Sequence, residues 1–418
     1  MFRLGKQPVA ERSCFSTMVK NRKPQIFAVL TFLLQPTSSA RLMTVETAPF
    51  PRPPRAVHGT TPMKSISRLL VFMPSWVGDI VMATPALRLL HETMPGVQLS
   101  CLLRPGVASV IEGCPWIENI ITGRAKTFSE VKDLAHRLHQ HHFDAVLLLP
   151  NSFNSALICF TARIPRRVGY NRDHRGLLLT KRCPVQKRPG GGYAPVPAVD
   201  YYLNLVDFFL DHKSPSQHNP ALQLWTTARE EAEADRIWQE AGLPQNQPDS
   251  PVILLNPGAN RQDKRWPAER FGLVADQLAK EYNASIIING SPAEQNVLLA
   301  VRDSASVPVV NLQEHGITLS SLKAVMKRVN LVITNDTGPR HMAVAMNTPV
   351  VTLFGPTDPR WTTLAFSRQV EIVADPTLDA AETADDHPER CAITRITVPQ
   401  VLDAARELLQ PALPQTSS

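Results

Sequence analysis

The clearest sign of the chain's architecture is the segment 331–354, which reads LVITNDTGPRHMAVAMNTPVVTLF. Apolar runs at 331–334 and 350–354 predict buried strands, and residues 339–346 between them predict a short helix. A strand, a helix and a strand in this order predict a parallel pair joined by a helical crossover. Ligands of such sheets bind at the carboxyl ends of the strands, which makes the polar turn 334–341 a candidate site.

The same alternation extends through the chain from Met63 onward. Further strands are expected at 68–73, 97–103, 145–149, 252–256 and 285–289. Further helices are expected at 79–92, 129–141, 155–160, 201–210, 228–241, 268–282, 319–328 and 398–409, and another helix begins at 292. Residues 211–220 are polar and carry no periodicity, which indicates a link between domains. We therefore predict an α/β protein with an N-terminal domain at 63–215 and a C-terminal domain at 216–418.

Residues 1–62 differ from this body in composition. An apolar run at 26–34 follows a basic stretch and resembles a signal peptide. The alternative is a disordered tail, or an upstream start with Met63 as the natural beginning. The net charge of +7 belongs to this extension, which holds nine Lys and Arg against two Glu, while the rest is balanced at 35 against 35. A bulk nucleic-acid footprint is therefore not expected.

Other counts narrow the class of protein. The 418 residues are enough for two cores, and no stretch reaches the roughly 20 apolar residues of a membrane span. The six cysteines show no metal-binding spacing, and Cys101 and Cys159 lie in apolar runs as expected of small core residues. We expect a soluble protein of a reducing compartment with no metal and no cofactor.

Four turns at predicted strand ends contain candidate binding or catalytic residues. In the first, Gly78 allows close approach of a ligand and Asp79 begins a helix, although Asp is also an ordinary helix-start residue. The second, residues 256–267, joins a glycine turn to Lys264, which suits a phosphate but also suits a solvated loop. Neither a GxGxxG nor a P-loop motif is present in these turns.

The third turn, 334–341, places Gly338 at a helix N-terminus, where aligned N–H groups favour a pyrophosphate. Asp336 and Thr337 are equally suited to capping the helix. His341 is equally explained as an ordinary helix residue. In the fourth turn, Gly290 is followed by Glu294, whose carboxylate suits a ribose diol.

Together the turns resemble glycosyltransferase family 9, the heptosyltransferases. The resemblance covers about 67–409 and rests on PSWVGDIVMATPAL, NPGANRQDKRWP and TNDTGPRHMAVAMNTPVVTLFGPTDP. PSWVGD and residues 150–157 are more similar to the second heptosyltransferase of inner-core assembly than to the first. The resemblance implies a GT-B fold, with two Rossmann-like domains facing a central cleft.

The implied reaction is transfer of heptose from ADP-heptose to a lipid-linked inner-core saccharide, with inversion. Asp79 matches the family's catalytic base and Lys264 its pyrophosphate-contacting lysine. The resemblance implies that the remaining donor contacts are Gly78, Asn260, Gly290, Glu294, Asp336, Thr337, Gly338 and His341. It implies no bound catalytic metal and a cytoplasmic enzyme with peripheral contact at the inner membrane.

Acceptor contacts are expected from Ser75, Trp76, Asn151, Ser152, Arg166 and Arg167. The two arginines belong to residues 163–188, which hold nine Lys and Arg and one acid, and whose charge would suit Kdo carboxylates and phosphates. A solvated loop is the alternative. Pro339 and Arg340 depart from the small or apolar residues frequent in relatives, and the 1–62 extension has no counterpart.

Two rival functions stay open at this point. One is a family 9 transferase for another nucleotide sugar or glycan, which activity with that sugar would identify. The other is a catalytically silent sugar-nucleotide-binding protein, which would bind ADP without turnover.

Overall fold

The computed structural model describes residues 66–187, 193–212, 218–244, 250–379 and 381–410. The expected extension at 1–62, Cys14, and the expected boundary between residues 215 and 216 lie outside these ranges.

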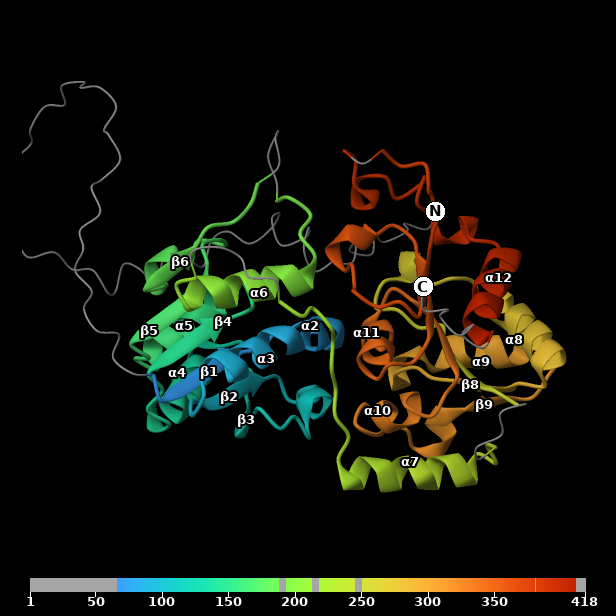
Figure 1. Cartoon of the computed structure of the whole chain (residues 1–418), viewed down its shortest axis with the longest axis horizontal. Coiled ribbons are helices and arrows are strands. Elements are labelled where there is room, and N and C mark those ends of the chain that lie inside the picture. The colour runs from blue at the N-terminus through green and yellow to red at the C-terminus, as the bar shows by residue number, and fades with distance from the viewer. Residues whose placement is uncertain (1–65, 188–192, 213–217, 245–249, 380, 411–418) are drawn as a thin grey trace, which may run out of the picture. The chain divides into compact units, whose positions relative to one another are not determined.

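The first domain is built on a six-stranded parallel sheet with the order β3-β2-β1-β4-β5-β6 (Figure 1). Its strands are β1 (Arg68–Phe72), β2 (Gln98–Leu103), β3 (Asn119–Thr122), β4 (Ala145–Leu148), β5 (Arg166–Tyr170) and β6 (Lys181–Cys183). Its helices are α2 (Val77–Met82), α3 (Thr84–Thr93), α4 (Phe128–Gln140), α5 (Phe153–Thr161) and α6 (Ala198–Phe209).

Helices cover both faces of this sheet, because successive strand residues point to opposite sides. Leu69 and Val71 pack with α2, α3 and α6, whereas Leu70 packs with α4 and α5. Cys101 and Cys159 are fully buried in these two cores, as expected, and each of the five described cysteines has a free thiol.

The second domain repeats the architecture with a parallel sheet of order β12-β11-β10-β7-β8-β9. Its strands are β7 (Val252–Asn256), β8 (Ser285–Ile288), β9 (Val309–Asn311), β10 (Leu331–Asn335), β11 (Val350–Phe354) and β12 (Gln369–Val373). Its helices are α7 (Ala228–Glu240), α8 (Ala268–Tyr282), α9 (Gln295–Ser304), α10 (Ser321–Met326), α11 (Gly338–Ala345) and α12 (Val398–Leu409).

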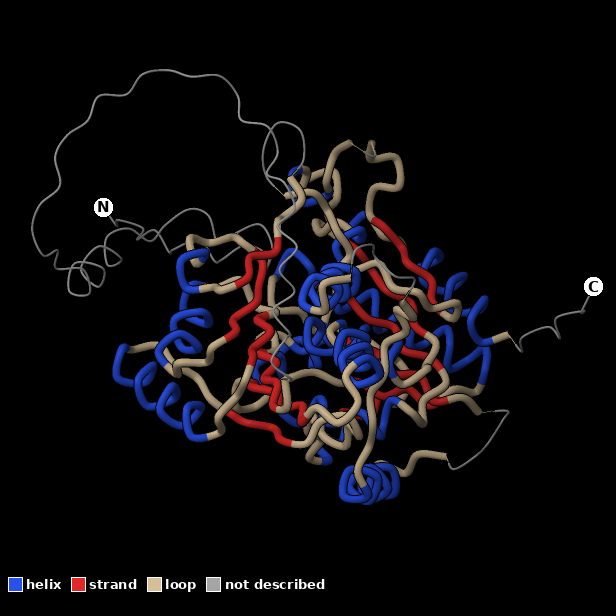
Figure 2. Tube along the Cα trace, turned by 60° about the vertical axis from the view of Figure 1, so that its left-hand side comes forward, coloured by secondary structure: helices blue, strands red, loops and turns tan. Residues whose placement is uncertain are grey.

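The second sheet also lies between two helical layers (Figure 2). Ile253 and Leu255 pack with α8, α9 and α12, while Leu254 and Val332 pack with α7, α10 and α11. The latter core continues into the first domain, where α2 packs against α11. Both six-stranded sheets are parallel and helix-covered, so the α/β prediction is confirmed.

The expected helix at 79–92 is wrong, because two helices occupy these residues. α2 ends at Met82 and α3 begins at Thr84. Pro85 has no backbone N–H to donate to the carbonyl of Val81 four residues earlier. The Thr84 hydroxyl donates to that carbonyl instead, at 2.8 Å.

Five strands were not predicted, namely β3, β5, β6, β9 and β12. They lie in the outer part of each sheet, where one side is less covered and sequences such as RRVGY and QVEIV carry charge. The strands that were predicted lie nearer the centre of each sheet and are mostly apolar.

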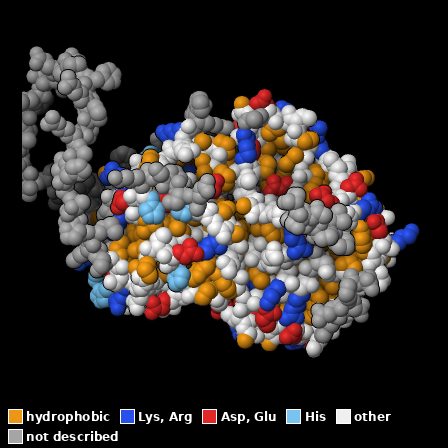
Figure 3. Space-filling view, in the orientation of Figure 1, with side chains coloured by type: hydrophobic (Ala, Val, Ile, Leu, Met, Phe, Trp, Pro, Cys, Tyr) orange, Lys and Arg blue, Asp and Glu red, His pale blue; other side chains and the backbone are white. Residues whose placement is uncertain are grey.

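Charged side chains are mixed on the molecular surface. On the face shown in Figure 3, Lys and Arg are interspersed with Asp and Glu over the described residues. This agrees with the even balance of charge in the body of the sequence.

A buried ion pair joins α7, α10 and the first domain. The side chains of Lys323 and Glu230 are both 0% exposed, and Lys323 Nζ lies 3.0 Å from Glu230 Oε1. The same ammonium donates to the backbone carbonyl of Glu112 in the first domain, at 3.0 Å. Ser320 Oγ donates to Glu230 Oε1 at 2.6 Å. The pair therefore holds three segments that are far apart in the sequence.

We expect Lys323→Met to lower the free energy of unfolding by about 3–5 kcal/mol, because Glu230 would stay buried without a counter-charge. Urea denaturation at neutral pH measures this change. The matched control is Lys327→Met, since Lys327 is 56% exposed beside Glu231 and its loss is expected to cost about 0–1 kcal/mol. Equal losses in the two variants would contradict the role given to the buried pair.

Candidate active site

The polar turns lie at the carboxyl ends of the central strands. In the second domain the turns after β7, β8, β10 and β11 share one edge, because these four strands are neighbours in a parallel sheet. In the first domain the turns after β1 and β4 share an edge for the same reason. The two edges supply the groups of the candidate site.

The N-terminal ends of α2 and α11 lie against each other. A Cβ atom built on Gly78 would lie 2.6 Å from Cδ2 of His341, and one on Gly338 would lie 3.0 Å from Cβ of Val77. A side chain at Gly78 would therefore force the buried His341 ring to move. The contact brings Asp79, in the first turn of α2, to the N-terminus of α11, where the helix dipole favours negative charge.

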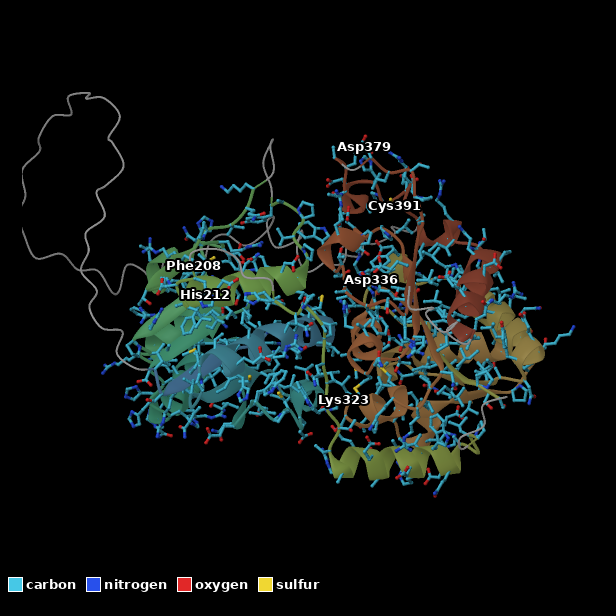
Figure 4. All side chains as sticks on the ribbon, viewed as in Figure 1. Phe208, His212, Lys323, Asp336, Asp379 and Cys391 are labelled. Carbon is cyan, nitrogen blue, oxygen red and sulfur yellow. The ribbon has the colours of Figure 1, made fainter. Side chains whose placement is uncertain are left out.

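Asp336, labelled in Figure 4, lies in the second domain. Its carboxylate is the centre of a buried network. Lys264 Nζ donates to Asp336 Oδ2 at 2.9 Å, and Thr357 Oγ1 donates to the same oxygen at 3.2 Å. Arg340 Nη1 lies 3.5 Å from Oδ1. Burial by itself raises the pKa of Asp336, but Lys264, then Arg340 and His341, hold this pKa well below its usual value. Asp336 is thus ionised near neutral pH.

Asp79 has the opposite electrostatic environment. Burial raises the pKa of Asp79 to about 7, the Asp336 carboxylate raises it as well, and Lys264 lowers it. The three residues therefore form one coupled set although they come from two domains. Near neutral pH this carboxyl exchanges its proton readily, which is what a general base requires.

His341 is a neutral imidazole in this environment. Burial lowers the pKa of His341 to about 3, Arg340 and Lys264 lower it too, and Asp336 opposes them. Its Nδ1 atom is buried and has no hydrogen-bond partner among the residues that the structure describes. A neutral ring with an open nitrogen is able to meet a hydroxyl group of a ligand.

Glu294 connects the turns after β7 and β8. Its carboxylate packs directly on Gly258, and it accepts hydrogen bonds from the backbone N and the Oγ of Ser291 at 2.8 and 2.7 Å. Gly290 accepts a hydrogen bond from Gln313 at its carbonyl, and Asn260 is exposed on the neighbouring turn. The structure thus brings Glu294, Gly290 and Asn260 to the edge that carries Asp336.

The turns after β1 and β4 carry Ser75, Trp76, Asn151 and Ser152. Trp76 is 46% exposed, which is high for so large an apolar side chain. Asn151 Oδ1 accepts hydrogen bonds from Arg175 at 3.2 Å and from the Tyr201 hydroxyl at 3.1 Å, while Ser152 caps α5. These four residues share the edge from which Asp79 approaches α11.

Arg166 and Arg167 lie elsewhere. They begin β5 and pair with Ala145 and Val146 at the amino end of β4, so they lie at the edge opposite the site. Arg166 donates to the carbonyl of Phe209, and Arg167 donates to that of Leu178. The structure therefore does not bring them together with the other expected acceptor residues, because this part of the basic segment enters the sheet as β5 and β6.

The same basic segment does supply a cation at the carboxyl edge. Arg172 follows β5, its side chain is 7% exposed, and its guanidinium lies 3.9 Å from the ring centre of Tyr193. Arg104 follows β2 at the same edge. Within the described ranges the Nε atoms of Arg104 and Arg172 are buried and have no hydrogen-bond partner, although Asp173 lies 3.5 Å from the latter. The rule that places chemistry after strand ends could have found Arg104, because β2 was predicted, and would have found Arg172 had β5 been predicted.

Thr357 and Arg340 are further residues that the sequence did not assign to the site. Thr357 lies in the turn after β11, within the GPTDP segment, and a signal was available because that segment follows a predicted strand. The sequence held no sign that Arg340 would point inward to Asp336, since an arginine on a short helix is usually exposed.

A comparison with known proteins identifies the family of the chain. Residues 131–392 match the sequence profile of glycosyltransferase family 9 (heptosyltransferase), which is more than half of the chain. The chain belongs to glycosyltransferase family 9.

Two kinds of relative illustrate the family. The chain is 28% identical over 305 residues to lipopolysaccharide heptosyltransferase 2 of Escherichia coli K12, covering 71% of this chain and 84% of that protein. Its structure is similar to that of a family 9 glycosyltransferase from Veillonella parvula, with a TM-score of 0.69 and 22% identity over 82% of this chain and 97% of that one. The E. coli ADP-heptose lipopolysaccharide heptosyltransferase II structure gives a TM-score of 0.66 with 24% identity, over 82% and 98% of the two chains.

These likenesses confirm the GT-B expectation for this family member. In the part of the chain that the structure describes, no three His, Cys, Asp or Glu side chains come together in a way that would hold a metal ion. None of the described helices is long and apolar enough to span a bilayer.

The raised pKa of Asp79 predicts a pH-dependent effect on stability. From an ordinary value of 3.8 up to about 7, the folded protein keeps a proton on Asp79 that the unfolded chain has lost, so folding loses stability as pH rises through this window. Asp79→Asn removes this loss. We expect the stability of the variant relative to the native protein to rise by roughly 2–3 kcal/mol between pH 5 and pH 8. Urea denaturation at both pH values measures it, and the same difference at both would contradict the assignment.

Proposed function

We propose that this chain transfers heptose from ADP-L-glycero-D-manno-heptose to the inner core of lipopolysaccharide, with heptosyl-Kdo-lipid A as acceptor and with inversion. The proposal is supported by membership of family 9 and by the similarity to lipopolysaccharide heptosyltransferase 2. The observation that carries it is the contact of α2 with α11, which joins a titrating carboxyl on one domain to a cation-rich strand edge on the other.

The donor's diphosphate fits the second domain. Lys264 provides a cation at the Asp336 carboxylate, and Thr337 and Gly338 begin α11, whose N–H groups and dipole favour an anion. When the bond from the sugar to the diphosphate breaks, negative charge grows on the ADP leaving group. A fixed ammonium and fixed N–H dipoles stabilise this charge without reorganising, which lowers the barrier.

Asp79 is proposed as the general base. Its pKa of about 7 suits removal of a proton from an acceptor hydroxyl while that oxygen attacks the anomeric carbon. Attack from the face opposite the departing ADP inverts the configuration. His341, packed against Gly78, offers its neutral imidazole to a sugar hydroxyl next to the reacting carbon.

The nucleoside half of the donor is assigned to the turns after β7 and β8. Glu294 is the carboxylate proposed for the ribose diol, and Gly290 packs beside it, where an added Cβ would lie 3.4 Å from Glu294 Oε2. Asn260 is exposed on the adjoining turn and is proposed to contact the phosphates.

The acceptor is assigned to the first domain. Ser75, Trp76, Asn151 and Ser152 line the edge beside Asp79, and the exposed indole of Trp76 suits the apolar face of a sugar ring. Arg104 and Arg172 replace Arg166 and Arg167 as the proposed partners of the acceptor's carboxylates and phosphates. Because this acceptor is anchored by lipid A, the enzyme is proposed to work in peripheral contact with the inner face of the inner membrane.

The decisive experiment is transfer of heptose from ADP-heptose to heptosyl-Kdo-lipid A, comparing the native protein with Asp79→Asn. We expect the variant to lose about 10²–10⁴-fold in kcat, the usual contribution of a positioned base. It should still bind ADP, because the nucleotide is assigned to the other domain. Asp133→Asn on α4 is the matched control, since Asp133 is exposed on a helix remote from the site.

The outcomes separate the rival functions. Turnover only with another nucleotide sugar would identify a family 9 transferase of different specificity. Binding of ADP without turnover by the native protein, even with the proper acceptor, would indicate a silent sugar-nucleotide-binding protein. Full activity of Asp79→Asn would contradict the assignment of Asp79 as the general base.

The acceptor assignment is tested by comparing Arg172→Ala with Arg166→Ala. Loss of a charge-assisted hydrogen bond is expected to raise the KM for the acceptor roughly tenfold or more in Arg172→Ala. The KM for ADP-heptose should not change. Arg166→Ala should keep the acceptor KM of the native protein, because Arg166 lies at the opposite edge of the sheet. A raised acceptor KM in Arg166→Ala, with no change in Arg172→Ala, would instead assign the acceptor to the basic residues at the amino end of β5.

A further inference from the structure

Arg340 is a fully buried cation behind the donor site. Its side chain is 0% exposed, and Nη1 donates to Thr362 Oγ1 at 2.9 Å. Nη2 donates to Glu371 on β12, and the guanidinium lies 4.8 Å from the ring centre of Phe354. These contacts hold the planar group in one orientation, with Nη1 aimed at Asp336, which precedes α11.

The contacts of Asp336 create a conflict when the donor binds. Lys264 is the nearest cation to Asp336, at 2.9 Å, and is also the residue assigned to the diphosphate. If the ammonium turns to the phosphates, Asp336 loses much of its counter-charge while staying 8% exposed and close to a new anion. A buried carboxylate in that state is costly unless another cation compensates.

We propose that Arg340 is a positioning residue that keeps Asp336 charged and in place while Lys264 binds the donor diphosphate. This inference rests on the proposed function, because it assumes an ADP-sugar donor. Arg340 lies on the opposite side of Asp336 from Lys264, contacting Oδ1 while Lys264 contacts Oδ2. Lys264 is therefore free to move without leaving Asp336 unpaired.

Glu371 influences how strongly Arg340 interacts with Asp336. Glu371 and Asp336 share the positive charge of the same guanidinium, although the two carboxylates bind different Nη atoms. Burial raises the pKa of Glu371, with Arg340 opposing and Asp336 adding to the rise, whereas the pKa of Asp336 is held low. Removing the charge of Glu371 would leave the guanidinium of Arg340 more fully to Asp336.

The test is calorimetric titration of the full chain with ADP, together with thermal unfolding of each variant. We expect Arg340→Met to weaken ADP binding roughly tenfold, because Lys264 would then remain bound to Asp336. Arg340→Lys keeps the charge and should recover most of the affinity. Glu371→Gln should bind ADP as tightly as the native protein or about twofold tighter, since the charge of Arg340 is no longer shared.

A double-mutant cycle distinguishes positioning from a role in folding. In an Asp336→Asn background, Arg340→Met should have no further effect on ADP affinity, because the charge on which Arg340 acts is gone. Additive losses in the double variant would overturn the inference, and so would equal weakening by Glu371→Gln and Arg340→Met. If Arg340→Met does not fold, Arg340→Gln takes its place, because glutamine keeps hydrogen-bonding groups without the charge and is expected to weaken ADP binding as Arg340→Met would.

The failure of this inference differs from that of the proposed function. A native protein that binds ADP, with an affinity that Arg340→Met leaves unchanged, would overturn the role of Arg340 and leave the donor assignment intact. A native protein that does not bind ADP would overturn both.

Discussion

The ionised carboxylate of Asp336 is the group on which the rest of the site depends. It is buried at the end of β10, where water does not screen it, so its field acts strongly on its neighbours. It binds Lys264, contributes to the raised pKa of Asp79 and partly opposes the low pKa of His341. One carboxylate therefore influences the charge state of a base on the other domain and the position of the cation assigned to the donor.

This arrangement requires the two domains to meet closely at one point. The meeting point is the contact of α2 with α11, where glycine at 78 and 338 lets the backbone of one helix approach the side chains of the other. The buried Lys323–Glu230 pair lies at a second junction, where Lys323 also binds the carbonyl of Glu112. A helix-to-helix contact at the site and an ion pair away from it thus connect the sheets of the two domains.

Central strands could be predicted from the sequence, whereas outer strands could not. Central strands such as β1, β4, β7, β10 and β11 are apolar on both faces, so a plain apolar run revealed them and the turns that follow. Asp79, Lys264, Glu294 and Asp336 were found in this way, and the family resemblance added their proposed roles. Outer strands such as β5 carry charge, and the sequence therefore suggested a basic acceptor-binding segment where the sheet continues.

The sequence by itself determined the alternation of strands and helices, and with it the class of fold and the turns that hold the chemistry, because these follow from short-range periodicity and from glycine at strand ends. Only the tertiary structure decided which charges meet. Arg166 and Arg172 are six positions apart on one basic segment, yet the length of β5 places them at opposite edges of the sheet. Arg340 reads as an ordinary helical arginine until packing buries it against Asp336 and Glu371. Electrostatic coupling depends on distance and burial in space, and neither quantity is encoded locally along the chain.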